Sequence, residues 1–148
     1  MNGIVCFGDS ITYGRGTLPS QGGCYYLKQW FEKKDEFNVV YNLGIPGETS
    51  EGLLARIDRE ANARIHFNYS EDKFLILIAI GTNDAKKKKV GHNFQPRSTA
   101  LEYERNIWEI LKIASKYDAK VALFGIPPCD EGRAFNFEGT RFTNDRLS

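Results

Sequence analysis

Cysteine is scarce in this sequence, and its pattern argues against two kinds of stabilised fold. The three cysteines, Cys6, Cys24 and Cys129, are odd in number, and no two of them have a Cys-x-x-Cys spacing. Such a set provides neither a disulfide framework nor a zinc site. It is typical of reduced thiols in a cytoplasmic protein, and we expect neither a metal nor a cofactor.

The sequence also has no hydrophobic run of membrane-spanning length. The longest uninterrupted apolar segment covers residues 74–80, whereas a membrane helix needs about 20 such residues. The chain begins with Met1, Asn2 and Gly3 and then passes directly into an expected strand, which leaves no room for a signal peptide. These absences predict a protein without a membrane span that stays in the cytoplasm.

No charge of one sign is in excess. The 20 lysines and arginines are balanced by 19 aspartates and glutamates, so the formal net charge is +1. A near-neutral chain has no global field that would attract nucleic acid or an anionic membrane. The hydrophobic content of 41% and the charged content of 26% are those of an ordinary globular protein. We expect a single domain over residues 1–148.

The sequence does contain a regular alternation of strand and helix patterns. Short apolar runs typical of buried strands alternate with segments in which apolar residues recur at helical spacing. This β-α-β-α-β-α-β order predicts an α/β fold, with a parallel sheet and helices on both of its faces. The expected strands cover residues 4–7, 37–41, 74–80 and 120–126, and the expected helices begin near Cys24, Ser50 and Thr99.

Three of the expected strands end in small or polar turns, at residues 8–10, 42–44 and 81–84. Because the carboxyl ends of parallel strands lie along one edge of a sheet, Ser10, Gly44 and Asn83 should meet there. A serine hydroxyl beside neutral hydrogen-bond donors is the apparatus for acyl transfer. Ser10 would attack an ester carbonyl. The oxyanion would be held by the N–H groups of Ser10 and Gly44 and by the Asn83 side-chain amide.

The same segments resemble the first three sequence blocks of the SGNH hydrolases, also called the GDSL esterase/lipase family. They read Gly-Asp-Ser-Ile-Thr over residues 8–12, Asn-Leu-Gly-Ile-Pro-Gly over 42–47 and Gly-Thr-Asn-Asp over 81–84. The resemblance implies a flavodoxin-like three-layer sandwich, with four of the family's five parallel strands present. It implies Ser10 as the nucleophile and the pair Gly44 and Asn83 as oxyanion donors. Asp9 is similar to the family's structural aspartate.

The family's fourth block, Asp-x-x-His, is absent from this sequence. In the family that block supplies the general base and its orienting carboxylate. Neither of the two histidines belongs to such a block. We expect His66 at the end of a helix and His92 in a solvated polar loop. We therefore expect a chain truncated at its C-terminus, in which residues 140–148 begin a further helix. The strand 120–126 would then be an uncovered sheet edge that is open to self-association.

Other functions remain open at this point. Without a general base the chain would be a non-catalytic binding module, or an inactive fragment that keeps the pocket. A flavodoxin-like nucleotide binder is a poorer interpretation, because Gly8, Gly14 and Gly16 do not fit the Gly-x-Gly-x-x-Gly pattern. The expected partner is a small-molecule ester. The lysine run 86–89 is expected to be a solvated surface, or otherwise a weak attraction for anionic substrates.

Several aromatic residues are expected to serve packing. Trp30 and Trp108 fall within helical patterns, and we expect both in the core. Phe135, Phe137 and Phe142 follow the last expected strand. They would either bury that loop or line an acyl pocket.

Overall fold

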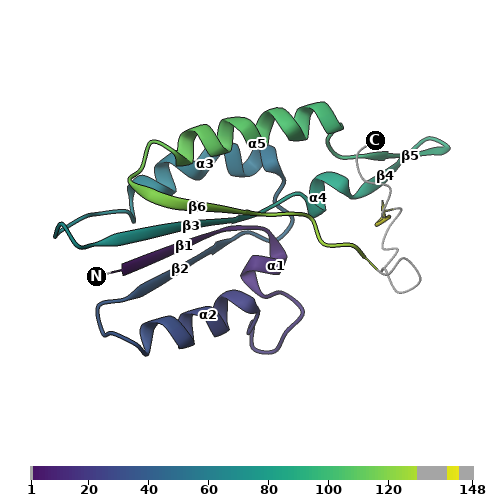
Figure 1. The fold of residues 1–148 in the computed structure, drawn as a ribbon. Helices are drawn as coiled ribbons and strands as arrows, with labels where there is room; N and C mark the ends of the chain where they lie inside the picture. Colours follow the sequence, from purple (N-terminus) through teal and green to yellow (C-terminus); the bar gives the residue numbers. More distant parts are fainter. Residues whose placement is uncertain (1, 130–139, 144–148) are drawn as a thin grey trace.

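A parallel sheet of four strands, in the order β2-β1-β3-β6, forms the centre of the fold (Figure 1). The computed structural model describes residues 2–129 and 140–143. This sheet confirms the predicted α/β class. The strands are β1 (Asn2–Gly8), β2 (Val39–Gly44), β3 (Lys73–Ala79) and β6 (Ala119–Phe124).

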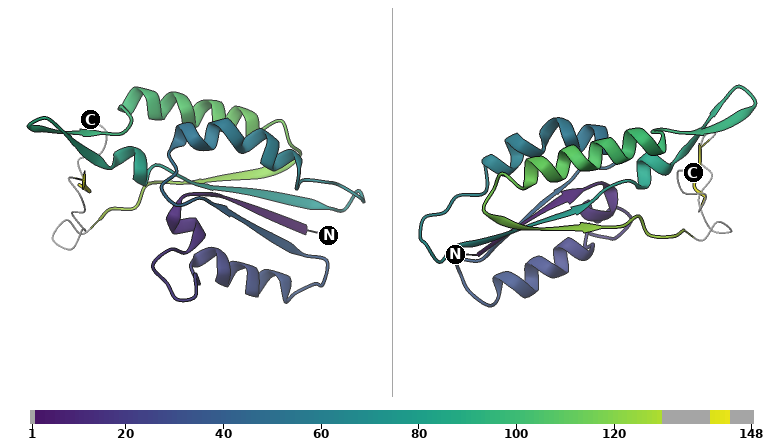
Figure 2. Two further views of the ribbon diagram at one scale, coloured as in Figure 1. Left: turned by 180° about the vertical axis from the view of Figure 1, so that it is seen from behind. Right: turned by 45° about the horizontal axis from the view of Figure 1, so that its top comes forward.

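Helices cover both faces of this sheet, as Figures 1 and 2 show. Helices α3 (Ser50–Asn62) and α5 (Ala100–Ala114) pack on one face, and α2 (Gly23–Glu32) packs on the other. Two single-turn helices, α1 (Ser10–Tyr13) and α4 (Thr82–Ala85), follow β1 and β3 directly. Among the helices of the described residues, none combines the length and the apolar character needed to cross a membrane.

The larger part of the core lies between the sheet and the pair α3 and α5. Phe74, Ile76 and Ile78 of β3 are buried in this part, together with Leu53 and Ile57 of α3. A smaller cluster lies between the sheet and α2, and its members from β3 are only partly buried. The alternation along β3 follows from the period of two in a strand, which sends successive side chains to opposite faces.

Two tryptophans do not lie in the core, so that expectation is wrong. Trp30 is 59% exposed and Trp108 is 66% exposed. The helix face that meets the sheet is defined in α2 by Cys24, Leu27 and Phe31, at the spacing i, i+3, i+7. Trp30 lies one position off that stripe, and the Lys34 ammonium lies 4.0 Å from its ring centroid.

A small antiparallel sheet replaces the polar loop expected at residues 86–93. Strands β4 (Lys87–Val90) and β5 (Asn93–Pro96) pair as a hairpin across the two-residue turn of Gly91 and His92. Gly91 has a φ of +62°, and a glycine at this position is typical of tight hairpin turns. The sequence did not predict β4 because its lysines show no alternation of apolar and polar residues.

Strand β7 (Thr140–Arg141) pairs antiparallel with β4 and completes this second sheet. The expectation that a helix begins at residue 140 is therefore wrong for its first two residues. The rest of that expected helix start, from residue 144 on, lies outside the described residues, as do Phe135 and Phe137. Phe142 is described, and the Lys86 ammonium lies 5.4 Å from its ring centroid.

The ends of the long helices are capped largely as the sequence indicates. A helix begins near Thr99 as predicted, and a capping box of Thr99 and Glu102 is present at the start of α5. The N-cap of α3 is Thr49 rather than Ser50. Ser50 is instead fully buried, and its backbone N–H and hydroxyl both bind a carboxylate from another part of the chain, Asp84.

Asp84, in the short helix α4 that follows β3, is the centre of a buried polar network. Its carboxylate accepts hydrogen bonds from the Ser50 N–H at 2.9 Å, the Ser50 hydroxyl at 2.6 Å and the Ser98 hydroxyl at 2.9 Å. The Ser50 hydroxyl accepts in turn from the Asn106 amide at 3.0 Å. The Asp84 side chain therefore joins α4 to the start of α3, and Ser50 extends the network to the middle of α5. Groups buried in this way are costly to leave unpaired.

Replacing Asp84 with alanine should therefore destabilise the fold strongly. We expect Asp84→Ala to lower the free energy of unfolding by about 2–4 kcal/mol, because several buried donors lose their acceptor. Urea unfolding followed by circular dichroism measures this change. The control Ser98→Ala removes a single donor and should cost about 1 kcal/mol. A loss in Asp84→Ala no larger than the loss in Ser98→Ala would show that the network does not hold these elements together.

Candidate active site

The register of the parallel sheet brings three loops to one edge. Gly8, the last residue of β1, pairs with Gly44 at the end of β2 on one side and with Ala79 at the end of β3 on the other. Ser10 follows Gly8 by two residues, and Asn83 follows Ala79 by four. Figure 1 shows the resulting helices α1 and α4 at the same end of the sheet. This end is where open α/β sheets bind ligands.

Ser10 is the first residue of α1 and is half-buried. The helix begins there because the Asp9 carboxylate caps it, accepting a hydrogen bond from the Ile11 N–H at 2.9 Å. Within the described part of the chain, neither the Ser10 N–H nor the Ser10 hydroxyl has a hydrogen-bond partner. The structure therefore presents a free hydroxyl and a free backbone donor on the same residue.

Asp9 is buried, with 1% of its surface exposed. Burial raises the pKa of its carboxyl group, and the nearby carboxylates of Asp84 and Glu48 raise it further, while the Ile11 N–H opposes the shift. The sequence analysis gave this residue a structural role. Its contacts fit that role, because its carboxylate caps α1 and also meets the Asn83 side chain of the neighbouring loop.

Asn83 is buried, and both of its amide hydrogens are engaged. Its Nδ2 atom donates to the Glu48 carbonyl oxygen at 2.9 Å and to Asp9 Oδ2 at 3.3 Å. These bonds fix the amide beside the helix that carries Ser10. The second contact is long, at the weak end of the hydrogen-bond range.

Gly44 allows the two neighbouring loops to approach closely. A Cβ atom at this position would lie 2.3 Å from the Tyr13 backbone nitrogen and 2.7 Å from the Asp9 carbonyl oxygen. Any side chain would therefore push α1 away from β2. The close packing of α1 against β2 thus requires glycine at this position. The Gly44 N–H donates to Asn42 Oδ1 at 3.1 Å.

The loop that contains Gly44 is held by an ion pair that the sequence analysis missed. Arg56 of α3 binds the Glu48 carboxylate, with 2.7 Å between Arg56 Nε and Glu48 Oε1, and its Nη2 donates to the Leu43 carbonyl oxygen at 2.7 Å. The two side chains are only 16% and 6% exposed. The partners are eight residues apart across a loop, so no helical or strand periodicity predicts the pair.

Neither histidine lies beside Ser10. His66 is exposed in the connection between α3 and β3, where its Nε2 lies 3.2 Å from the Ala63 carbonyl oxygen. That connection leads to the amino end of the sheet, opposite the end that carries Ser10. His92 is exposed in the turn between β4 and β5. Both are surface residues, as the sequence analysis expected, although the turn of His92 belongs to a hairpin.

Two small cavities adjoin the Ser10 loop. One of about 240 Å³ includes Asp9, Ile11 and Thr82 in its wall, and the other, of about 290 Å³, includes Ile11, Thr12 and Cys24. Phe124 of β6 lines both. These mostly apolar walls can hold the carbon chain of a small ligand beside the hydroxyl.

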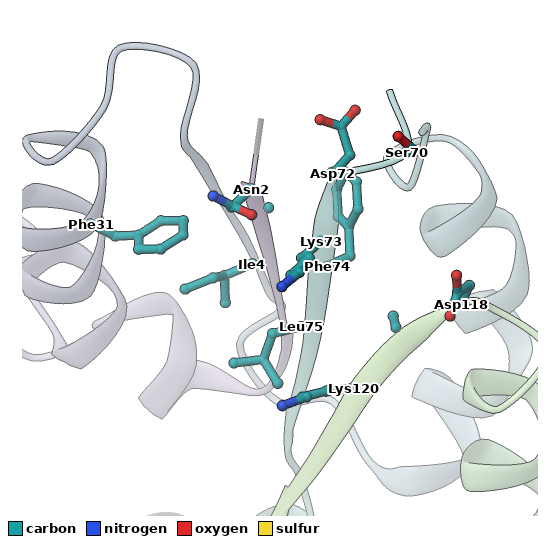
Figure 3. Close-up of a pocket in the computed structure, with 12 residues that line it drawn as sticks. Asn2, Ile4, Phe31, Ser70, Asp72, Lys73, Phe74, Leu75, Asp118 and Lys120 are labelled. Atoms are coloured by element: carbon teal, nitrogen blue, oxygen red, sulfur yellow. The ribbon is translucent and has the colours of Figure 1, made fainter. Parts of the chain in front are cut away.

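A larger cavity, of about 590 Å³, lies at the opposite end of the sheet (Figure 3). It is lined by Asn2 at the start of β1 and by Lys73 at the start of β3. The whole length of β1 separates it from Ser10, so its size does not make it the reaction site. Across residues 2–129 and 140–143, no three histidine, cysteine, aspartate or glutamate side chains come together to hold a metal ion.

Comparison with solved structures finds this architecture in several proteins. A structure of TesA is 26% identical, with a TM-score of 0.66 over 88% of this chain and 64% of that chain. The esterase EstA from Pseudoalteromonas sp. is 25% identical, with a TM-score of 0.62 over 86% of this chain and 62% of its own. The acetylxylan esterase Axe2 from Geobacillus stearothermophilus, at 20% identity and a TM-score of 0.58, shares the fold over 82% of this chain and 57% of that chain.

This chain therefore spans less than two thirds of the length of each of these proteins. No curated protein matches it. The profile of the GDSL-like Lipase/Acylhydrolase family matches residues 6–147, which is almost the whole chain. The match includes all three of the segments that meet at the carboxyl edge of the sheet. The chain belongs to the GDSL-like lipase/acylhydrolase family.

Proposed function

We propose that this chain hydrolyses carboxylic esters, with Ser10 as the nucleophile. The observation that carries the proposal is the Ser10 hydroxyl, which has no partner among the described residues and lies at the sheet edge beside the loops of Gly44 and Asn83. Membership of an acylhydrolase family supports it. EstA, which is 25% identical, is inhibited by monoethylphosphonate in its solved structure. A phosphonate resembles the tetrahedral intermediate of ester hydrolysis.

In this mechanism the Ser10 oxygen attacks the carbonyl carbon of the ester while a base accepts the hydroxyl proton. The carbonyl oxygen becomes an oxyanion, which accepts hydrogen bonds from the N–H groups of Ser10 and Gly44 and from the Asn83 amide. The intermediate collapses when the bond to the alcohol breaks, and the alcohol takes the proton. Water then attacks the acyl-Ser10 ester and releases the carboxylic acid.

Two of the three donors have resting partners that the oxyanion must replace. The Gly44 N–H is bound by the exposed side chain of Asn42, and the Asn83 amide makes its long contact to Asp9. The Asn42 side chain can turn into water at little cost, because its other contact among the described residues, from Nδ2 to the Tyr13 carbonyl oxygen, is long at 3.4 Å. At Gly44 an oxyanion makes a stronger, charge-assisted hydrogen bond than the neutral side-chain oxygen of Asn42. We infer that substrate displaces Asn42 from the Gly44 amide.

The general base has no candidate among the described residues. Both histidines are remote from Ser10, and the sequence has no Asp-x-x-His segment. Triad enzymes that lack one member keep a rate of about 10³–10⁴ over water from binding and the oxyanion hole. We therefore expect residues 1–148 by themselves to be a weak esterase. The same observation favours the second candidate, a binding module that holds esters without cleaving them.

A fluorophosphonate probe distinguishes these two candidates. We expect it to phosphonylate Ser10, because the adduct places an oxygen among the three donors, and we expect no adduct in Ser10→Ala. Intact-mass and peptide mass spectrometry locate the label. The other serines, such as Ser70 and Ser98, are the internal control and should stay unmodified. Absence of a Ser10 adduct, with no hydrolysis of p-nitrophenyl acetate above the level of Ser10→Ala, would leave only the binding module.

The Asn83 amide should contribute mainly to the transition state. We expect Asn83→Ala to lower kcat about 100-fold or more with a smaller change in KM, since the oxyanion exists only after attack. Initial rates of p-nitrophenyl acetate hydrolysis measure both constants. Asn62→Ala is the matched control, because Asn62 is exposed at the far end of α3. A change in KM alone would make Asn83 a substrate-binding residue instead.

A further inference from the structure

Three basic side chains line a cavity of about 280 Å³ on the second sheet. They are Lys86, Lys88 and Arg97, and Thr140 lines the cavity with them. Lys86 lies in extended backbone directly before β4, and Lys88 lies two positions further on within the strand, so both side chains can face the same cavity. Arg97 follows the last residue of β5, and Thr140 of β7 pairs directly with Lys88. Among the residues that the structure describes, no acidic side chain lines this cavity.

These three cations have no acidic partner in the part of the chain that the structure describes. The ion pairs there use other residues, for example Lys28 with Glu32 and Lys112 with Glu109. Lys86 contacts the ring of Phe142, and Arg97 donates to the Gly47 carbonyl oxygen at 3.3 Å. Like charges gathered in one hollow repel each other, and an anion bound between them would remove that cost.

The basic cavity adjoins the loops of the candidate active site. Arg97 reaches Gly47, which lies three residues beyond the proposed oxyanion donor Gly44. The backbone N–H of Arg97 also donates to the carbonyl oxygen of Asp84 at 3.1 Å, and Asp84 is the neighbour of Asn83 in α4. Arg97, which lines the cavity, is therefore hydrogen-bonded to both of the loops that carry oxyanion donors.

We infer that this cavity is a subsite for the anionic group of an ester substrate, such as a carboxylate, sulfate or phosphate. The inference rests on the proposed esterase function and names its substrate class. A volume of about 280 Å³ is just below the range of whole drug-sized ligand pockets, so the cavity suits a charged head group. An arginine fork beside two ammonium groups suits the oxygens of such a group. The ester bond would then extend toward Ser10.

Binding of inorganic phosphate tests the subsite without relying on catalysis. We expect phosphate to shift the backbone amide NMR signals of residues 86–88 and 97 at low salt, and to bind more weakly as ionic strength rises. Lys86→Gln/Lys88→Gln and Arg97→Gln should each weaken this binding by about fivefold or more. The control Lys33→Gln/Lys34→Gln removes two exposed lysines near the end of α2 and should leave phosphate binding unchanged. Equal phosphate affinity in all variants would overturn the inference.

A matched pair of esters tests whether the subsite serves catalysis. We expect a higher kcat/KM for 4-acetoxybenzoate than for its neutral methyl ester, and a loss of that preference in Lys86→Gln/Lys88→Gln. Absence of a preference in the unmodified chain would contradict the inference, as would tight binding of single-stranded DNA in place of phosphate. Phosphate binding without Ser10 phosphonylation would refute the esterase function alone. Ser10 phosphonylation with unaltered phosphate binding in the variants would refute the subsite alone.

Discussion

The close approach of three parallel strand ends is the constraint on which the rest of the structure depends. Gly8 stands between Gly44 and Ala79 in register. A Cβ atom on Gly8 would lie 2.5 Å from the Ala79 carbonyl oxygen and 2.1 Å from the Thr12 hydroxyl oxygen. Because positions 8 and 44 are glycines, α1 can pack directly against the ends of β1 and β2. That placement puts the Ser10 hydroxyl within the same small region as the donors of the other two loops.

Two buried carboxylates then fix the loops that leave this edge. Asp9 caps α1 and contacts the Asn83 amide. Asp84 binds Ser50 at the start of α3 and Ser98 in the segment before α5. Neither carboxylate needs to touch a substrate. Their function in this account is to hold Asn83 and Ser10 in a fixed relation, which is the preorganisation that oxyanion stabilisation requires.

The parallel sheet and the meeting of its three polar turns could be predicted from sequence, because both follow from apolar runs and from the order of the elements. Contacts between distant segments could not. The bonds from Asp84 to Ser50 and the pair of Glu48 with Arg56 join residues without periodic spacing. The hairpin of β4 and β5 was missed because lysines occupy most of β4. Trp30 was predicted in the core but lies one position away from the buried stripe of α2. A shift of one position along a helix is enough to turn a side chain outward.

The central claim is that the Gly44 N–H and the Asn83 amide bind the oxygen that develops charge when Ser10 is acylated. A crystal structure of the phosphonate adduct tests it most directly. We predict a phosphonyl oxygen at about 2.7–3.1 Å from both donor nitrogens, with the Asn42 side chain displaced from Gly44. An adduct in which Asn42 still accepts from the Gly44 N–H and the phosphonyl oxygens face water would contradict the account.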